Sequence, residues 1–416
     1  MKAMFSRSVW LAKSLLRLAQ TAPAGGAAEP PPEHAPISKS QKMEKTIWIG
    51  ENLYTLASDD AYLDTMGDKF EPHMVQLFKC LIKPNDVVAD VGGNIGMTAI
   101  LFSGLARKVY AFEPSPSTFA ILKTNLSRAQ TSNVEAVNLG LGERSEKLTI
   151  TFAANNRSGG FISDKLSLKN HVTEEVQIES LDHFFSRAAD RPDFIKIDVE
   201  GYEGSVIRGA YDTIKAKRPL VTLELNHFCL NVLRRITVPD FLDFLRSVFP
   251  FLYAVDTDNT TIADLHDEEW SYRVMHEHLT RFRFPNLVGG FDPALTATLK
   301  ELELSARAAL CIRQPLVVTP RVINAAGGLR VIAPPRSVRC MERFSLQVEV
   351  SNNSNCDWSG SGDCPVYLSY HWQDQDGKIM VFDGERSALK NGDVHAKEIA
   401  PTTMQVVAPA SGGDLH

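Results

Sequence analysis

The sequence contains few cysteines, and no two of them form a CxxC pair. Six occur among 416 residues, and only Cys356 and Cys364 lie close together. Disulfide frameworks and structural zinc sites need closely spaced thiols, so this pattern argues against both and is typical of a reducing cytosol. We therefore expect a cytoplasmic protein with unpaired thiols. A Cys356–Cys364 bridge is the alternative that the spacing leaves open.

The sequence also lacks a positive overall charge and a long apolar run. Its formal net charge is −6, with 23% charged residues. Nucleic-acid binding usually needs a basic field, and a membrane-spanning helix needs roughly 18 consecutive apolar residues. We therefore expect neither a nucleic-acid partner nor a transmembrane segment.

Residues 1–44 are unlike the rest of the chain. Leu11, Leu15 and Leu18 recur at helical spacing among basic residues, which is typical of an amphipathic helix that contacts a membrane surface. A dispensable, frayed extension is the alternative interpretation. Residues 22–36 are rich in Pro, Ala and Gly and predict an extended linker. Residues 1–44 are thus predicted to be an amphipathic segment and linker, with peripheral contact to the inner face of the membrane as one outcome.

Residues 45–256 alternate short β-branched runs with helical stretches. The strand-like runs are Val87–Val91, Lys108–Glu113, Phe194–Gly201 and Leu220–Leu225. Strands that are interleaved with helices predict a parallel sheet covered on both faces. The predicted fold class is therefore α/β, with a Rossmann-like, doubly wound, mostly parallel sheet.

The remainder of the chain changes character twice. Residues 257–314 turn polar and then helical, and they are expected to form a helical connector. Residues 315–416 contain alternating runs such as Phe344–Val350 and Val366–Trp372, separated by Asn, Ser, Gly and Asp. That pattern predicts a second domain, an all-β sandwich.

A glycine-rich turn, DVGGNIG at residues 90–96, stands where a buried strand ends and a helix begins. Glycines there permit a sharp turn and a close approach of ligand to backbone, and a helix N-terminus favours negative charge. The turn lacks the full GxGxxG spacing that holds a pyrophosphate, which favours a ligand without phosphates.

The second strand ends in Glu113 and Pro114, and a carboxylate at that point can accept hydrogen bonds from ribose hydroxyls. Glu113 follows Gly92 at about the 20-residue spacing of one βαβ step. An adenosine-bearing cofactor is therefore predicted. Because NAD and S-adenosylmethionine both contain adenosine, a nicotinamide-dependent oxidoreductase stays open as an alternative.

A third group consists of Lys196, Asp198 and Glu200, at the carboxyl end of a later strand. Strand alternation is expected to place all three on one side. Charges in an apolar strand are costly unless they are paired or bind something, so these residues are candidate catalytic residues. An internal Lys–Asp ion pair is the structural alternative.

The next strand ends in the run Glu224, Leu225, Asn226 and His227. Asp198 with Glu224 and Asn226 would form an oxygen-rich Mg²⁺ site that orients an acceptor hydroxyl. Alternatively, His227 or Asp198 acts as general base on that hydroxyl. A lone histidine at a strand end is more often a hydrogen-bonding surface residue.

Together these segments resemble the FkbM family of S-adenosyl-L-methionine-dependent methyltransferases. The likeness covers about half of the chain in order, and it rests on DVGGNIGMTAILFSGLARKVYAFEPSPSTFAILKTNL, NVEAVNLGLGERSEKL, FIKIDVEGYEGSVIRGA and PLVTLEL. It implies methyl transfer to oxygen, on polyketide-type macrolides or on sugars of glycolipids and surface polysaccharides.

The resemblance also implies roles for individual residues. Glu113 matches the ribose-binding acid, and Asp198 and Glu200 match the second acidic motif of the family, without a division into base and ligand. Gly93 stands where Ala is usual, which should only loosen the loop. The other matches are the cofactor loop (Asp90, Gly92, Asn94, Gly96) and the turn near adenine (Gly140, Leu141, Gly142, Glu143).

The C-terminal region, with WSGSG, VYLSYHWQDQDG and DGERSALKNG, is similar to β-sandwich modules attached to bacterial polysaccharide-modifying transferases. This likeness implies that Trp358, Tyr370, His371 and Trp372 stack on sugar rings. Packing of these aromatic residues in a core is the alternative.

The sequence therefore predicts an O-methyltransferase that acts on a hydroxyl of a sugar, glycolipid, polysaccharide or polyketide-like acceptor, as in polysaccharide biosynthesis. Its partners would be S-adenosyl-L-methionine, a small-molecule or glycan acceptor and, in one version, Mg²⁺. The alternatives are the nicotinamide-dependent oxidoreductase and a non-catalytic carbohydrate-binding or scaffold protein.

Overall fold

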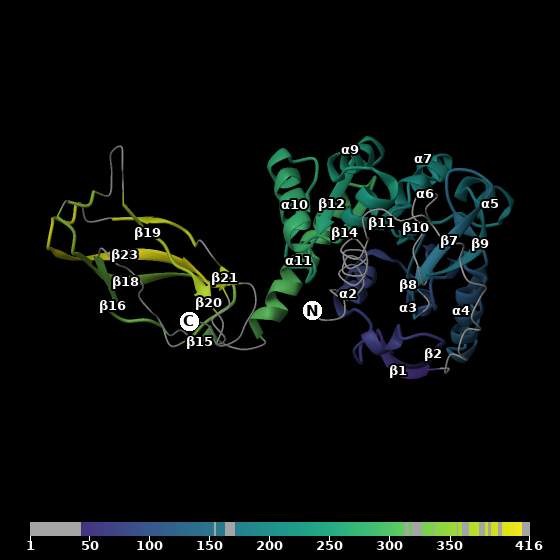
Figure 1. The fold of residues 1–416 in the computed structure, drawn as a ribbon, viewed down its shortest axis with the longest axis horizontal. Helices are drawn as coiled ribbons and strands as arrows, with labels where there is room; N and C mark the ends of the chain where they lie inside the picture. The colour runs from purple at the N-terminus through teal and green to yellow at the C-terminus, as the bar shows by residue number, and fades with distance from the viewer. Residues whose placement is uncertain are drawn as a thin grey trace, which may run out of the picture. The chain divides into compact units, whose positions relative to one another are not determined.

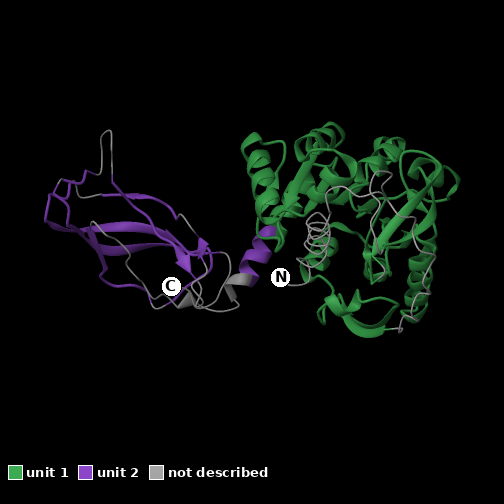
Figure 2. Ribbon diagram, in the orientation of Figure 1, with its two compact units in different colours: residues 1–302 green, residues 303–416 purple. Residues whose placement is uncertain are grey.

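The computed structural model describes residues 43–409, except 154, 163–170, 313–315, 318–326, 336, 356, 360–365, 374–378, 382–383 and 390–392. The predicted N-terminal helix and the Cys356–Cys364 pair lie outside the described residues. The chain divides into two compact units, residues 1–302 and 303–416 (Figure 2). Within the described part of the chain, no helix is long and apolar enough to cross a membrane.

The first unit is built on an eight-stranded sheet with the strand order β13-β12-β14-β11-β10-β3-β4-β5. Figure 1 labels β12, β14, β11 and β10 of this sheet. The strands from β11 to β5 are parallel, whereas β14, β12 and β13 pair antiparallel. The predicted α/β class with a mostly parallel sheet is thus confirmed. The strands are β3 Val87–Val91, β4 Lys108–Phe112, β5 Val134–Val137, β10 Phe194–Ile197, β11 Leu220–Glu224, β12 Phe251–Val255, β13 Ile262–Asp264 and β14 Asn286–Gly290.

The sheet extends beyond the boundary expected at residue 256. Strand β14 comes from the stretch 257–314, which the sequence analysis describes as a connector, yet it lies between β11 and β12. Its residues are all buried, so removing it would leave β11 and β12 without their shared partner. That stretch contains two helices, α10 (Glu268–Arg281) and α11 (Ala294–Ile312), and α11 spans the division between the two units.

Helices cover both faces of the sheet because alternate strand residues are apolar on each side. Val88, Phe194 and Val288 pack with the helices of one face, whereas Ala89, Ile195 and Leu223 pack with those of the other. The helices of the first face are α2 Pro72–Leu81, α3 Met97–Ser103, α4 Pro116–Arg128 and α11. The helices of the second face are α5 Leu181–Arg187, α6 Glu203–Gly209, α7 Tyr211–Lys217, α9 Val238–Val248 and α10 Glu268–Arg281.

Smaller elements complete the first unit. The hairpin β1 Met43–Ile49 and β2 Asn52–Ser58 precedes the short helix η1 Leu63–Thr65. A four-stranded sheet with the order β6-β9-β7-β8 follows β5 in sequence. Its strands are β6 Gly140–Leu141, β7 Glu146–Ala153, β8 Asn156–Ile162 and β9 His171–Glu179; the short helices after β11 are α8 His227–Cys229 and η2 Leu230–Arg234.

The second unit is rich in strands, as predicted, with an antiparallel sheet β16-β18-β23 at its centre. Trp372 is buried and its indole donates a hydrogen bond to Val407 O, while the Tyr370 hydroxyl accepts one from Val407 N. Both rings belong to the core, and His371 between them is exposed. The strands are β15 Leu316–Val317, β16 Gly327–Val331, β17 Ser337–Val338, β18 Arg343–Asn352, β19 Tyr367–Leu368, β20 Trp372–Gln373, β21 Ile379–Val381, β22 Ser387–Ala388 and β23 Ile399–Val407.

Candidate active site

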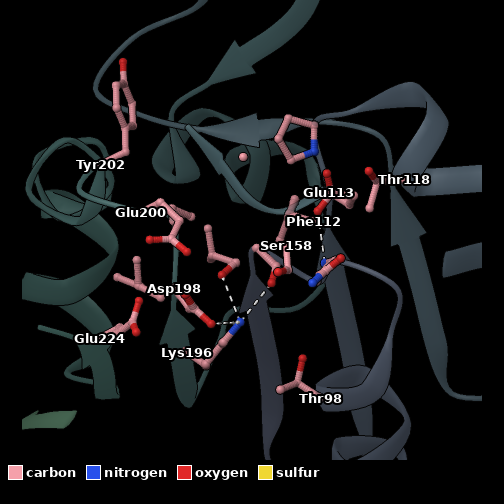
Figure 3. Close-up of a pocket in the computed structure, with 18 of the residues that line it drawn as sticks. Thr98, Phe112, Glu113, Thr118, Ser158, Lys196, Asp198, Glu200, Tyr202 and Glu224 are labelled. Carbon is pink, nitrogen blue, oxygen red and sulfur yellow. Dashed lines mark hydrogen bonds and ion pairs between the residues drawn. The ribbon is translucent and has the colours of Figure 1, made fainter. Parts of the chain in front are cut away.

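A cavity of about 170 Å³ opens at the carboxyl ends of β3, β4, β10 and β11. The chain runs from β3 to β4 on one side, and the later strand β10 pairs with β3 on the other side. Open α/β sheets bind ligands at such a reversal of strand order. Figure 3 shows Glu113 on one side of the cavity, Glu224 on the other, and Lys196 and Asp198 between them.

The glycine turn forms the middle of the cavity wall. Gly92 and Gly96 have φ angles of 83° and 98°, in the left-handed region that glycine tolerates. A Cβ atom on Gly92 would overlap the backbone carbonyl oxygen of Asp198. The amides of Gly92 and Gly93 donate to Phe112 O at 3.1 and 2.8 Å. The turn therefore packs between the ends of β4 and β10, and Glu113 and Asp198, which follow these strands, lie in one site.

Glu113 lies on the cavity wall with only 6% of its surface exposed. Its carboxylate accepts hydrogen bonds from Asn94 N and Ser115 N, each at 3.0 Å. Burial raises the pKa of this carboxyl to about 7, against the lowering effect of those two bonds. A carboxylate has about four acceptor positions, so two are left for hydroxyl donors of a ligand.

An apolar slot lies beside Glu113. Pro114, Leu139, Gly140 and Leu141 line it. A Cβ atom on Gly140 would overlap the side chain of Ile178, which faces the same cavity. A flat, apolar ligand group adjacent to a pair of hydroxyls would fit this arrangement.

Two residues of the predicted cofactor loop do not line the cavity. Asp90 is fully buried, where it accepts a 2.6 Å hydrogen bond from the Thr98 hydroxyl and pairs with Lys196 at 3.2 Å. Gly96 caps helix α3 and faces Leu122. Both residues therefore support the turn through contacts within the protein and do not contact the cavity.

Lys196 lies between two carboxylates. Its ammonium donates to Gly92 O at 2.9 Å, and it pairs with buried Asp90 and with Asp198, the latter at 3.7 Å (Figure 3). Asp198 keeps 25% of its side chain exposed and lines the cavity. The predicted ion pair thus exists, and it belongs to the site.

The expected alternation of Lys196, Asp198 and Glu200 along a single strand is corrected by the structure. Strand β10 ends at Ile197, and Glu200 has a φ of 51° in the turn that follows. Glu200 lines the cavity but is buried, and its Oε2 accepts hydrogen bonds from Asn226 Nδ2 at 2.9 Å and from the Cys229 thiol at 3.3 Å.

A further acid, Glu203, holds this turn in place. It is fully buried, and its Oε1 accepts hydrogen bonds from Val199 N and Gly201 N at 3.2 and 3.1 Å. Burial raises its pKa to about 7. Glu203 is not among the candidate residues; its place in the first turn of helix α6 is the sequence signal that could have identified it.

The proposed Mg²⁺ ligands are not brought together as a set. Glu224 lines the cavity, but Asn226 does not, because both ends of its buried amide bind within the protein: Nδ2 donates to Glu200, and Oδ1 accepts from Cys229 N. Among the residues described, no three His, Cys, Asp or Glu side chains are grouped to hold a metal ion.

His227 lies outside the cavity lining. Its ring packs against those of His278 and Phe282, with centroid distances of 5.0 and 5.7 Å, and burial lowers its pKa. The structure therefore gives no support to His227 as general base, and Asp198 is the predicted base that lines the cavity.

One stretch of the first unit matches a known family. Residues 90–247 match the family model for the methyltransferase FkbM domain, and this range contains the glycine turn, Glu113 and Asp198. This confirms the resemblance that the sequence motifs indicate.

Three curated methyltransferases are similar to this domain. Methyltransferase 1 of Beauveria bassiana is 33% identical over 31% of this chain, and the hexuronic acid methyltransferase AglP of Haloferax volcanii is 30% identical over 35%. The 2-O-methyltransferase NoeI of Sinorhizobium fredii is 28% identical over 35%. The chain spans 60%, 59% and 66% of the length of these relatives, in the same order.

Among solved structures, the methyltransferase FkbM from Methylobacillus flagellatus is 20% identical to this chain. The match covers 40% of this chain and 38% of that one, with a TM-score of 0.29.

Proposed function

We propose that this protein is an S-adenosylmethionine-dependent O-methyltransferase that acts on a hydroxyl of a sugar or sugar-like acceptor. The observation that carries the proposal is that Glu113 and Asp198 line one cavity and follow strands β4 and β10, which flank β3 on opposite sides. One carboxylate can bind a ribose, and the other can accept a proton. The FkbM domain match supports the same reaction.

The cavity fits S-adenosylmethionine at its Glu113 end. The Glu113 carboxylate would accept hydrogen bonds from the two ribose hydroxyls, and the slot of Pro114, Leu139, Gly140 and Leu141 would hold the adenine ring. Left-handed Gly92 lets the turn lie close to the ligand.

The protein's own contribution to the reaction is alignment and proton removal. When bound, the sulfonium supplies an already activated methyl group. Asp198 would accept the proton of the acceptor hydroxyl as its oxygen attacks, which is general-base catalysis. Lys196 positions Asp198 and compensates the charge of buried Asp90. Glu203 fixes the turn that carries Asp198 through two backbone amides.

Two of the similar proteins support a sugar hydroxyl as the acceptor class, since one is named a hexuronic acid methyltransferase and another a 2-O-methyltransferase. Glycolipid, polysaccharide and polyketide-like acceptors all present such hydroxyls. A cytoplasmic location stays part of the proposal; Cys80 and Cys229, which form no disulfide, support it.

The proposal is tested first by calorimetry with S-adenosylhomocysteine and NAD. Binding of S-adenosylhomocysteine alone is expected, and preferential binding of NAD would favour the oxidoreductase alternative. The acceptor is then sought by mass spectrometry of glycans and lipids extracted from cells with and without the gene. Loss of one methyl group from a hydroxyl is expected; unchanged glycans and lipids would contradict the acceptor class.

A further inference from the structure

One face of the central sheet changes from apolar to polar as it reaches the cavity. On β10, Phe194 is followed two residues later by Lys196, and on β11, Leu220 is followed by Thr222. On antiparallel β14, Val288 packs into the core, and Asn286, two residues away on the same face, lies nearer the cavity. Side chains two residues apart share a face. The polar residues therefore lie on the same sheet face as Phe194 and Leu220, which pack in the core.

Strand pairing places these polar residues next to one another. Lys196 is the register partner of Thr222, and Glu224 is the register partner of Asn286. Side chains of directly paired residues lie about 5 Å apart on the same face. Lys196, Thr222, Glu224 and Asn286 thus form a continuous polar row across β10, β11 and β14, and all four line the cavity.

Two members of this row have polar atoms without a partner. Thr222 is 3% exposed and Asn286 is 6% exposed, and neither Thr222 Oγ1 nor Asn286 Nδ2 makes a hydrogen bond within the described structure. Buried polar groups are nearly always hydrogen-bonded, because an unmade bond costs the full desolvation of the group. Two such atoms on adjacent strands of one cavity wall indicate that the missing partner is a ligand.

We propose that Thr222 and Asn286 form an acceptor subsite that binds hydroxyls of a polyhydroxylated ring beside the hydroxyl that is methylated. The inference rests on the proposed function and deepens it. A ligand hydroxyl can accept from Asn286 Nδ2 and can either donate to or accept from Thr222 Oγ1. Both partners are neutral, which fits a polyol.

The position of the row matches that role. Glu113 follows β4, Asp198 follows β10, and the Thr222–Asn286 pair lies on β11 and β14, so the sheet order is cofactor, base and acceptor. Phe282 and Pro285, which precede Asn286 in the sequence, also line the cavity and add apolar surface. A sugar ring presents both C–H and O–H groups, and this wall offers a partner to each.

The test measures binding by saturation-transfer NMR, with S-adenosylhomocysteine present and a panel of methyl glycopyranosides of hexoses and hexuronic acids as probes. Thr222→Val and Asn286→Leu are each expected to weaken glycoside binding about tenfold and to leave S-adenosylhomocysteine affinity unchanged. Thr222→Ser, which keeps the hydroxyl, is expected to bind as the wild type does. Thr213→Val, a buried threonine on α7 outside the cavity, is the matched control.

Thermal unfolding separates a binding role from a structural one. Because the Thr222 hydroxyl has no partner in the protein, Thr222→Val is expected to melt at the same temperature as the wild type or higher. A lowered melting temperature with unchanged glycoside binding would overturn the subsite. So would a wild type that binds S-adenosylhomocysteine and no glycoside, whereas a wild type that fails to bind S-adenosylhomocysteine would overturn the proposed function as well.

Discussion

The two ends of the cavity are built in different ways. At the end proposed to bind the cofactor, called the cofactor end, Glu113 accepts two backbone hydrogen bonds, and the glycine turn donates to Phe112 O, so each of these groups has a partner within the protein before any ligand binds. At the acceptor end, Thr222 and Asn286 have buried atoms without partners. The cofactor end is thus preorganised by backbone hydrogen bonds, whereas the acceptor end has buried side-chain atoms that lack hydrogen-bond partners. The predictions below test this contrast.

The largest effect is expected from Asp198→Ala, which removes the base between the two ends. We expect methyl transfer to fall about 10²- to 10⁴-fold, as is typical for loss of a general base. S-adenosylhomocysteine affinity should stay unchanged, because the cofactor end does not depend on this side chain. Steady-state kinetics and calorimetry measure the two quantities. Unimpaired turnover would refute the role, and Asp190→Ala, in an exposed ion pair, is the control.

The next effect concerns stability, because Lys196 contacts both the Gly92 turn and Asp198. Lys196→Met leaves Asp90 buried without its cation, and we expect a loss of about 3–5 kcal/mol in the free energy of unfolding. Urea denaturation measures it. Lys217→Met breaks a partly exposed pair with Asp193 and should cost less than about 1 kcal/mol. Equal losses in the two variants would show that the buried pair is not special.

A smaller effect is expected from Glu113→Gln at the cofactor end. Ribose hydroxyls donate to the ionised carboxylate, so wild-type S-adenosylhomocysteine affinity should rise with pH and level off above the raised pKa of about 7. The variant should bind about 10- to 100-fold more weakly above that pH and show no such rise.

Calorimetry across pH 5 to 9 checks this prediction of ligand linkage. The stability of the free protein should change with pH in the opposite direction. Between the ordinary pKa of 4.5 and the raised pKa of about 7, the folded state keeps the Glu113 proton and the unfolded state loses it. The contribution of Glu113 to stability therefore falls as pH rises through this range. Glu203 has a similarly raised pKa, so affinity is the readout specific to Glu113. A pH-independent wild-type affinity would contradict the assignment.

The smallest effect is expected from Cys229→Ala, which removes one side-chain donor to Glu200. Asn226 still holds the carboxylate, so we expect turnover to fall less than tenfold and stability to fall by about 1 kcal/mol. Kinetics and urea denaturation check both values. A loss as large as that of Asp198→Ala would make Glu200, rather than Asp198, the residue nearest the chemistry.

Local sequence was sufficient for the cofactor end and for much of the fold. Glycine residues at left-handed positions, a carboxylate one βαβ step later and β-branched strands are contiguous patterns whose geometry depends on near neighbours. That is why the α/β class, the Gly92 turn and the place of Glu113 on a ligand cavity could be predicted. The FkbM resemblance, now confirmed, rests on the same contiguous motifs.

Other features depend on contacts between distant segments. Asn226 stands two residues after Glu224, and the sequence predicts both as metal ligands, yet the Asn226 amide binds Glu200 and Cys229 in the folded chain. Strand β14 enters the sheet between β11 and β12, and it brings Asn286 to Glu224 across 62 positions of sequence. No local sequence pattern predicts the contact of Asn226 with Glu200 or the pairing of Asn286 with Glu224.

The sequence by itself determined the parallel core of the sheet, the glycine turn and the position of the Glu113 carboxylate, because backbone conformation and alternation are local properties. Only the tertiary structure decided which polar side chains face one another: Lys196 between Asp90 and Asp198, and the unpartnered atoms of Thr222 and Asn286 on one wall. The physical reason is that the cost of burying a polar group depends on whether a partner arrives from elsewhere in the chain.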